Sequence, residues 1–392
     1  MKRWFNCKTN TYNRRKNMNY LDNWNNFKSN KPFRELPFSK RNWGHPNHSI
    51  CSFYGKLKPS ISHFLIDTFT NKNDIVLDCF TGSGTIPFEA ALMNRKSFGI
   101  DINPIAVAIT SSKIGETNKD SIIRELDLLR DFIKNTTVGN EVLIKAQMFG
   151  FNKKLEEYYH PDTLKEIILA REYFQKNKNH NTNQNLIISC LLHILHGNRP
   201  YALSRNSHPI TPYAPTGDYI YKDLMEKLSV KVLKTIDNAI LNPIQQAGKV
   251  FEGDILNDWN SEIQNVNAII TSPPFFDSTK FYLTNWIRNW FMGWEFEDFE
   301  TEKLKFIDTL QKKSFDPYDR ILAQCKDRLT KDGIVLFHLG KSHKKDMGDA
   351  IIPYAKKYFK KIELYNEDVS DIEKHGVEDK GSVNVHQYLL MS

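Results

Sequence analysis

The chain has 392 residues, with 54 lysines and arginines, 46 aspartates and glutamates and a formal net charge of +8. This length favours two domains or one domain with a large insertion, and no apolar run reaches the ~20 residues of a membrane span. The 5 cysteines form no C-x-x-C pair, which argues against a disulfide scaffold and a zinc site and predicts a reducing cytoplasm.

Positive charge is concentrated in residues 1–45, which hold 11 lysines and arginines and 2 acids and leave the rest of the chain near neutrality. Basic side chains can bind the phosphates of a nucleic acid, and the interleaved aromatic side chains can stack or anchor this arm to the protein body. We expect phosphate contacts at Arg14, Arg15 and Lys16. The alternative is that A/T-rich codons produced this composition without any such contact.

An apolar run over residues 75–78 ends at Asp78, and a glycine loop and a helix with Pro87 in its first turn follow at once. Strand, glycine loop and helix form the usual nucleotide-binding arrangement. A second strand over residues 97–100 ends at Asp101, at about the 20-residue spacing of a ribose-hydroxyl acceptor. A generic α/β turn is the alternative. The expected nucleotide contacts here are Asp78, Phe80, Thr81, Gly82, Ser83, Gly84, Thr85 and Asp101.

Residues 114–249 are mostly helical by their apolar spacing, which predicts helices over 164–170, 186–195 and 224–236. Residues 196–217 interrupt this pattern with a polar, proline-stiffened loop that fits neither a regular helix nor a central strand. Such long loops are usually functional or disordered. Docking of this loop on the catalytic half is the alternative to base or phosphate contacts, which are expected at Arg199, Tyr201, Ser204, Arg205, Asn206 and Ser207.

A buried strand over residues 266–270 precedes the sequence Thr271-Ser272-Pro273-Pro274-Phe275, which suits the methylation of a planar amino group. The lone pair of such an amine is delocalised into its ring, so the nitrogen becomes a better nucleophile when acceptors hold its hydrogens. Ser272 Oγ and the carbonyl of Pro273 can accept them, and Phe275 offers a face to an extruded base. A Pro-Pro turn after a core strand is the alternative. The other predicted elements are strands over 250–255, 333–338 and 383–390 and a helix over 281–291.

Three motifs together resemble the amino-methyltransferases of DNA, which use S-adenosylmethionine: D-x-F-x-G-S-G-T from Asp78, G-I-D-I-N-P around Asp101, and T-S-P-P-F from Thr271. Residues 48–59 are similar to the segment that precedes the cofactor loop in that family. The resemblance covers about residues 48–113 and 250–340. It implies further cofactor contacts at Tyr54, Lys56, Ile102, Asp254, Ile255 and Thr271, with a strand-end cap as the alternative role of Asp254.

Serine before Pro-Pro is similar to the enzymes that methylate the exocyclic amine of cytosine, whereas enzymes that act on adenine usually carry Asp or Asn there. The resemblance therefore implies catalytic roles for Ser272, Pro273, Pro274 and Phe275, although Phe275 replaces the commoner tyrosine. The motif order matches one of the family's circular orders, in which the insertion usually reads the DNA target.

We therefore expect an α/β fold, a Rossmann-like methyltransferase sheet with a mostly helical insertion and a basic N-terminal arm. The expected function is site-specific methylation of cytosine amino groups in duplex DNA with S-adenosylmethionine, in a restriction-modification system with a cognate restriction endonuclease and without a metal. The alternatives are an adenine or RNA target, or a non-catalytic nucleic-acid-binding subunit. The expected parts are the arm (1–45), the cofactor half (46–113), the target-recognition insertion (114–249) and the catalytic half (250–392).

Overall fold

The computed structural model describes residues 20–177, 179–276, 280–369 and 383–392. Its centre is a seven-stranded sheet with the strand order β3-β2-β1-β4-β5-β7-β6. Strands β3, β2, β1, β4 and β5 are parallel, and β7 is antiparallel to both of its neighbours. The strands are β1 Ile75–Asp78, β2 Lys96–Asp101, β3 Lys249–Glu252, β4 Val266–Thr271, β5 Leu329–Ser342, β6 Ile362–Asp368 and β7 Val383–Met391. The predicted methyltransferase fold class is confirmed.

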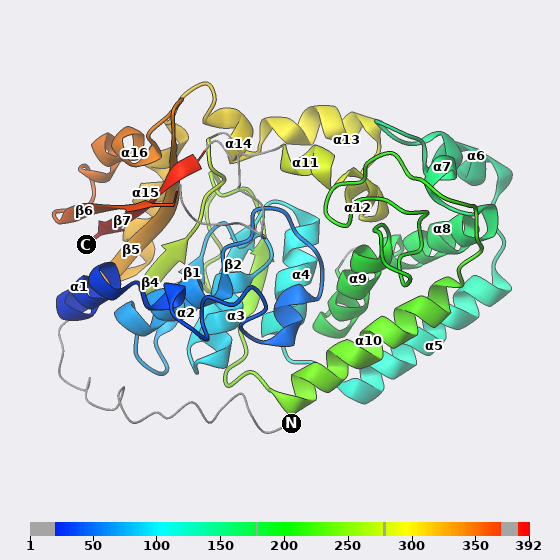
Figure 1. The fold of residues 1–392 in the computed structure, drawn as a ribbon, viewed down its shortest axis with the longest axis horizontal. Coiled ribbons are helices and arrows are strands. Elements are labelled where there is room, and N and C mark those ends of the chain that lie inside the picture. Colours follow the sequence, from blue (N-terminus) through cyan, green and yellow to red (C-terminus); the bar gives the residue numbers. More distant parts are fainter. Residues whose placement is uncertain (1–19, 178, 277–279, 370–382) are drawn as a thin grey trace.

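Helices cover both faces of this sheet (Figure 1). Successive residues of a strand point to opposite faces, so Ile334 and Leu336 of β5 pack on one layer of helices, whereas Val335 and Phe337 pack on the other. The first layer is α1 (Tyr20–Asn30), α2 (Pro59–Phe69) and α3 (Thr85–Leu92); the second is α15 (Pro317–Arg328) and α16 (Met347–Ala355).

The described part of the basic arm is anchored to the sheet. Trp24 and Phe27 of α1 are buried, and both rings contact Tyr388 of β7. Lys28 and Arg34 form ion pairs with Glu363 and Glu367 of β6, respectively. The anchoring role of the aromatic residues is therefore seen for residues 20–34, whereas Arg14, Arg15 and Lys16 lie outside the described residues.

The insertion is a helical layer beside the sheet (Figure 1). The three predicted helices are α8 (Pro161–Gln175), α9 (Thr182–Ile194) and α10 (Leu224–Leu241). Their apolar sides share one core with α5 (Lys119–Asn135), with α4 (Pro104–Ile114), which follows β2, and with α12 (Trp286–Phe291) of the second half. Residues 196–217 contain only isolated β-bridges, as the loop prediction required.

The C-terminal part of the sheet differs from the prediction in two ways. Strand β7 does not close the sheet, because it lies between β5 and β6. Strand β6 was not predicted, since most of its residues are half-buried or exposed and three of its seven are acidic, which leaves no apolar run or strict alternation to find.

Candidate active site

The carboxyl ends of β1, β2 and β4 meet at one edge of the sheet, where ligands bind in open α/β folds. Asp78 ends β1 and Thr271 ends β4. Thr271 Oγ1 donates a hydrogen bond of 2.6 Å to Asp78 Oδ1 and accepts one of 3.2 Å from the Phe80 N–H. Thr271 is fully buried, so its side chain ties the glycine loop to the Ser-Pro-Pro motif, and we do not propose it as a cofactor contact.

The loop after β1 needs its two glycines. Gly82 and Gly84 have φ values of 48° and 69°, in the left-handed region that favours glycine. A Cβ on Gly84 would lie 2.6 Å from Thr110 Oγ1 in α4. The Gly82 N–H donates to Asp101 Oδ2 at 2.8 Å, so the loop is fixed against the end of β2.

The other polar side chains of this loop face the protein. Thr81, Ser83 and Thr85 are all at least 96% buried, with exposed fractions of 4%, 3% and 4%. Ser83 Oγ lies 3.3 Å from Thr85 Oγ1, and the buried Lys113 ammonium donates to the Ser83 carbonyl. The three side chains therefore stabilise the loop from within, and contacts of these residues with a cofactor stay a prediction that concerns their main chain.

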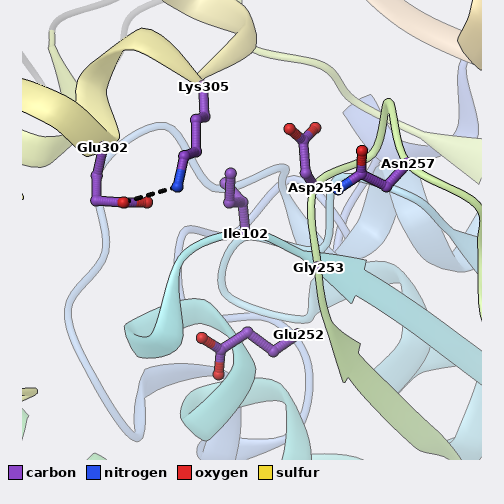
Figure 2. Close-up of a pocket in the computed structure, with 7 residues that line it drawn as sticks. All are labelled: Ile102, Glu252, Gly253, Asp254, Asn257, Glu302 and Lys305. Atoms are coloured by element: carbon purple, nitrogen blue, oxygen red, sulfur yellow. Dashed lines mark hydrogen bonds and ion pairs between the residues drawn. The ribbon is translucent and has the colours of Figure 1, made fainter.

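A cavity of about 360 Å³ opens beside the ends of β2 and β3 (Figure 2), within the usual size range of small-molecule sites. Ile102 and Asp254, both predicted, line it, whereas Ile255 is 7% exposed and packs in the core. Ile102 is the apolar side chain that lines this cavity, and the adenine-packing role expected of Ile255 stays a prediction. The full lining is Ile102, Glu252, Gly253, Asp254, Asn257, Glu302 and Lys305.

The far wall of the cavity comes from the segment after β4, which the sequence did not indicate. Lys305 and Glu302 form an ion pair of 2.8 Å and lie across from Asp254 in Figure 2. Asp254 also caps its own strand end, because its Oδ1 accepts the Leu256 N–H at 2.9 Å. Both roles considered for Asp254 are thus compatible with its position.

Two carboxyl groups at this edge have raised pKa values because they are buried. Desolvation raises the pKa of Asp101 to about 6, although the N–H groups of Asn103 and Gly82 favour its charged form. Desolvation raises the pKa of Asp78 to about 7, against the hydrogen bonds from Thr271 and Phe80. Asp101 directly precedes Ile102, which lines the cavity, and perturbed carboxyl groups close to a cavity are typical of functional sites.

These residues fit S-adenosylmethionine. The Asp101 carboxylate can accept ribose hydroxyls, Asp254 can accept the adenine amine, and Ile102 can pack on the adenine ring. A Cβ on Gly253 would meet no atom within 4 Å, so the main chain there borders open space. Among the described residues, no group of three or more His, Cys, Asp or Glu side chains could hold a metal ion, and no helix has the length and apolar character of a membrane span.

Ser272 follows β4 directly and lies next to β5. Its Oγ is 3.1 Å from Nδ1 of His338, a buried residue of β5. Phe275 lies with its ring centroid 5.5 Å from that of His338. A Cβ on Gly340 would lie 2.7 Å from the Phe275 ring, so this glycine allows the ring to lie against β5.

The Pro-Pro turn is held by a second pair of side chains. Gln311 Nε2 donates to the Pro274 carbonyl at 2.9 Å, and the hydroxyl of Tyr318 donates to Gln311 Oε1 at 3.0 Å. Pro273 is buried within the same turn. The sequence offered one signal for His338, a polar residue at the end of a predicted strand, and none for Gln311.

The segment before α2 borders the glycine loop. A Cβ on Gly82 would lie 3.5 Å from the Phe53 ring. This ring stacks on the Phe281 ring, with their centroids 6.3 Å apart. Tyr54 is exposed and meets the same ring at 6.2 Å. Lys56 Nζ donates to the His48 carbonyl at 3.2 Å, so it braces this segment. Tyr54 and Lys56 therefore stand at the rim of the site, and their contacts with a cofactor remain predictions.

The polar loop of residues 196–217 directs much of its polarity inward. Arg205 donates to the carbonyls of Gly217 at 2.7 Å and Glu157 at 3.1 Å. Ser204 is fully buried, and the Ser207 hydroxyl donates to the Tyr213 carbonyl at 2.9 Å. These contacts favour structural roles for Ser204 and Ser207, and their base contacts stay a prediction.

Other side chains of this loop remain accessible. Arg199, Tyr201 and Asn206 are exposed. The loop is docked on the second half by Arg288, a fully buried residue that the sequence did not single out. Its guanidinium donates to carbonyl groups of three separate segments, at Pro209 (3.2 Å), Leu192 (2.9 Å) and Ser52 (2.8 Å). The docking alternative is therefore realised, and Arg199, Tyr201 and Asn206 are left as candidate contacts.

Comparison with known proteins places the chain near DNA methylases. Residues 4–112 match a family model of DNA methylases of the N6/N4 type. The Type II methyltransferase M.MjaII of Methanocaldococcus jannaschii is 29% identical over 115 residues, which are 28% of this chain and 21% of that protein. The similarity thus spans only about a fifth of the relative's length.

Solved methyltransferase structures resemble the chain more distantly. A TehB-like methyltransferase from Corynebacterium glutamicum has a TM-score of 0.33 at 10% identity, covering 95% of this chain and 99% of the other. TrmN from Thermus thermophilus has a TM-score of 0.33 at 12% identity, covering 88% and 51%. The fold assignment therefore depends on the strand order of the sheet and not on these similarities. Over residues 4–112 the chain is therefore similar to DNA methylases, and its seven-stranded sheet has the predicted α/β fold.

Proposed function

We propose that this protein methylates the exocyclic amino group of cytosine at a specific sequence in duplex DNA, as part of a restriction-modification system with a cognate endonuclease. The observation that carries the proposal is the position of Ser272. It joins the end of β4, is tied through Thr271 to Asp78 of the glycine loop, and lies 3.1 Å from a buried histidine. In the proposed reaction, this fixed serine hydroxyl meets the extruded base beside the cofactor.

The residues of the chain divide the work between binding and orientation. Asp101, Ile102 and Asp254 bind the nucleoside part of the cofactor, and the turn around Gly82 lets the main chain pass close to it. Bound S-adenosylmethionine supplies an electrophilic methyl group on a sulfonium, which is already a good leaving group. No strong base is therefore required of the protein.

On the base side, Ser272 Oγ and the Pro273 carbonyl accept the two amine hydrogens and turn the nitrogen lone pair towards the methyl group. This interaction is stronger in the transition state, where the nitrogen gains positive charge, so it accelerates the reaction. Phe275 stacks on the extruded base. Gln311 fixes the turn through the Pro274 carbonyl.

The target-reading surface is proposed in the insertion, at Arg199, Tyr201 and Asn206, which are exposed. Arg14, Arg15 and Lys16 of the arm are proposed to bind phosphates. The proposed parts of the chain are the arm (1–45), cofactor half (46–113), insertion (114–249) and catalytic half (250–392).

Incubation with isotope-labelled S-adenosylmethionine and duplex DNA, followed by nucleoside analysis, tests the proposal directly. We expect label in cytosine methylated on its amino group. Label in adenine alone would change the proposed target base to adenine and leave the proposed site unchanged. Label in RNA alone would change the proposed substrate from DNA to RNA. Absence of label in every nucleic acid, with the cofactor still bound, would favour a non-catalytic nucleic-acid-binding subunit.

A further inference from the structure

Ser272 and His338 lie on the same face of the sheet. Ala268 and Ile270 of β4 share a core with Ile334 and Leu336 of β5, and alternation continues this face to positions 272 and 338. The parallel register pairs Thr271 with Phe337, so the next residues on the two strands are neighbours. Their contact at 3.1 Å therefore follows from strand pairing and does not depend on a flexible loop.

We propose that His338 is a positioning residue for Ser272. Its Nδ1 accepts a hydrogen bond from the serine hydroxyl, which leaves both Oγ lone pairs to face the target amine. This inference rests on the proposed methylation of an amino group and extends it to a residue outside the Ser-Pro-Pro motif. It assigns His338 the tautomer that carries its proton on Nε2.

The chemistry of the amine selects this direction of the hydrogen bond. A serine hydroxyl has one proton and two lone pairs. If His338 donated instead, one lone pair would be used, and the serine proton would be free to point at the amine hydrogens. Burial and the neighbouring His386 hold the pKa of His338 well below its ordinary value, so the imidazole is neutral and has one free acceptor nitrogen.

The surroundings of the imidazole fit this tautomer and fix its position. Its Nε2 is buried with no hydrogen-bond partner, so no polar group competes to set the tautomer from that side. The imidazole centroid lies 4.8 Å from that of His386 and 5.1 Å from that of Tyr388. The face of an aromatic ring can accept a weak hydrogen bond from an N–H group. Tyr388 is itself held, because its hydroxyl donates to Glu367 at 2.8 Å.

Kinetics of matched variants test the proposal, with wild-type activity and the methylated base established first. His338→Phe keeps the ring volume but removes Nδ1, and we expect kcat to fall roughly tenfold with KM for DNA and cofactor affinity little changed. His338→Asn places an acceptor near the lost Nδ1 and should recover part of that loss. His180→Phe, in the turn between α8 and α9, is the control: it removes a bond to the Phe174 carbonyl and should leave kcat unchanged.

A double-mutant cycle separates positioning from packing. In the Ser272→Ala background, His338→Phe should lower kcat by less than about twofold more, because the group through which it acts is gone. An equal loss in both backgrounds would overturn the proposal and make His338 a packing residue. These outcomes use whichever base the wild-type protein methylates, so a wrong base assignment does not obscure them.

The tautomer can be read without activity. Nitrogen NMR of histidine-labelled protein should show His338 with Nε2 protonated and with an Nδ1 shift that moves in Ser272→Ala; His338→Asn assigns the signal. A proton on Nδ1, or an unchanged Nδ1 shift in Ser272→Ala, would overturn the proposal. This result stands even if wild-type protein transfers no methyl group or if His338→Phe fails to fold.

Discussion

The carboxyl edge of the sheet and the polar loop of residues 196–217 contain similar kinds of side chain but use them differently. At the edge, Asp254 and Glu302 line an open cavity, and Ser272 and Phe275 both contact His338. In the loop, Arg205 and Ser207 donate to nearby main-chain carbonyls, which satisfies their hydrogen bonds within the protein. Polar residues therefore indicate a site only where the fold leaves their hydrogen-bonding groups beside an opening.

The largest effect is expected at Ser272. Ser272→Ala should fold and bind cofactor and DNA normally, but its kcat should fall on the order of ten- to a thousandfold, because the transition state loses an acceptor. The matched control is Ser207→Ala in the loop, which should lower stability by about 1 kcal/mol and leave kcat unchanged. Single-turnover methylation and thermal unfolding measure the two quantities. Full activity of Ser272→Ala would overturn the proposed mechanism.

Asp101→Ala should weaken S-adenosylmethionine binding by about 1–3 kcal/mol, the usual loss for a charged hydrogen-bond partner. Because Asp101 also accepts the Gly82 N–H at 2.8 Å, the loop itself should loosen. Calorimetric titration of the folded variant measures the affinity. An unchanged affinity would remove Asp101 from the cofactor site.

The two arginines of the loop should differ. Arg199 is exposed, and Arg199→Ala should relax sequence choice by roughly 1–3 kcal/mol at one base pair if its side chain reads a base edge. Arg205→Ala should instead lower stability by about 1–3 kcal/mol, because two carbonyls lose a charged donor. Sequencing-based methylation maps and thermal unfolding distinguish them. Relaxed sequence choice in Arg205→Ala with unchanged stability would reverse the assignment.

Cofactor affinity should depend on pH through Asp101. Its pKa is raised to about 6 by burial, and ribose hydroxyls donate best to the ionised carboxylate, so binding should release a proton below that pH. The affinity should therefore weaken as pH falls from about 7 to 5, by at most about tenfold per unit. Titrations in Asp101→Asn should lack this component. A profile identical to wild type would assign the dependence elsewhere, with Asp78 as the next candidate.

The smallest effect is expected in the arm. Deletion of residues 1–40 would remove Trp24 and Phe27 from the core, so substitution is the sharper test. Changing Arg14, Arg15 and Lys16 to Gln should flatten the slope of log affinity against log salt by up to about 0.9 per lost phosphate contact. The control changes three lysines that precede β6 to Gln, namely Lys356, Lys360 and Lys361. An unchanged slope would mean that these three arm residues do not bind DNA.

The sequence predicted those elements whose signal is local. The strand and glycine loop from residue 75 and the strand before Ser272 each combine an apolar run with characteristic turn residues, so their pattern is contained in about ten residues. The placement of β7 could not be predicted in this way, because the order of strands depends on pairing between distant segments.

The same distinction applies to the site. The motif residues of the proposed site come from short local patterns, whereas His338 and Gln311 contact the Ser-Pro-Pro turn across 66 and 37 residues of chain. The burial of Ser204 and Ser207 could not be predicted either, since residue type does not tell whether a hydroxyl faces solvent or its own loop. Burial is a property of the folded chain.

The position of β7 also has a consequence for synthesis. Both of its neighbours, β5 and β6, precede it in the chain, so a ribosome releases them before the strand that joins them. Until β7 is made, the strand that carries His338 keeps an unpaired edge, which is a template for wrong pairing. A nascent chain can therefore contain both motif segments while the strand that carries His338 still lacks its partner. In the proposed mechanism, Ser272 gains its support only when this late strand enters the sheet.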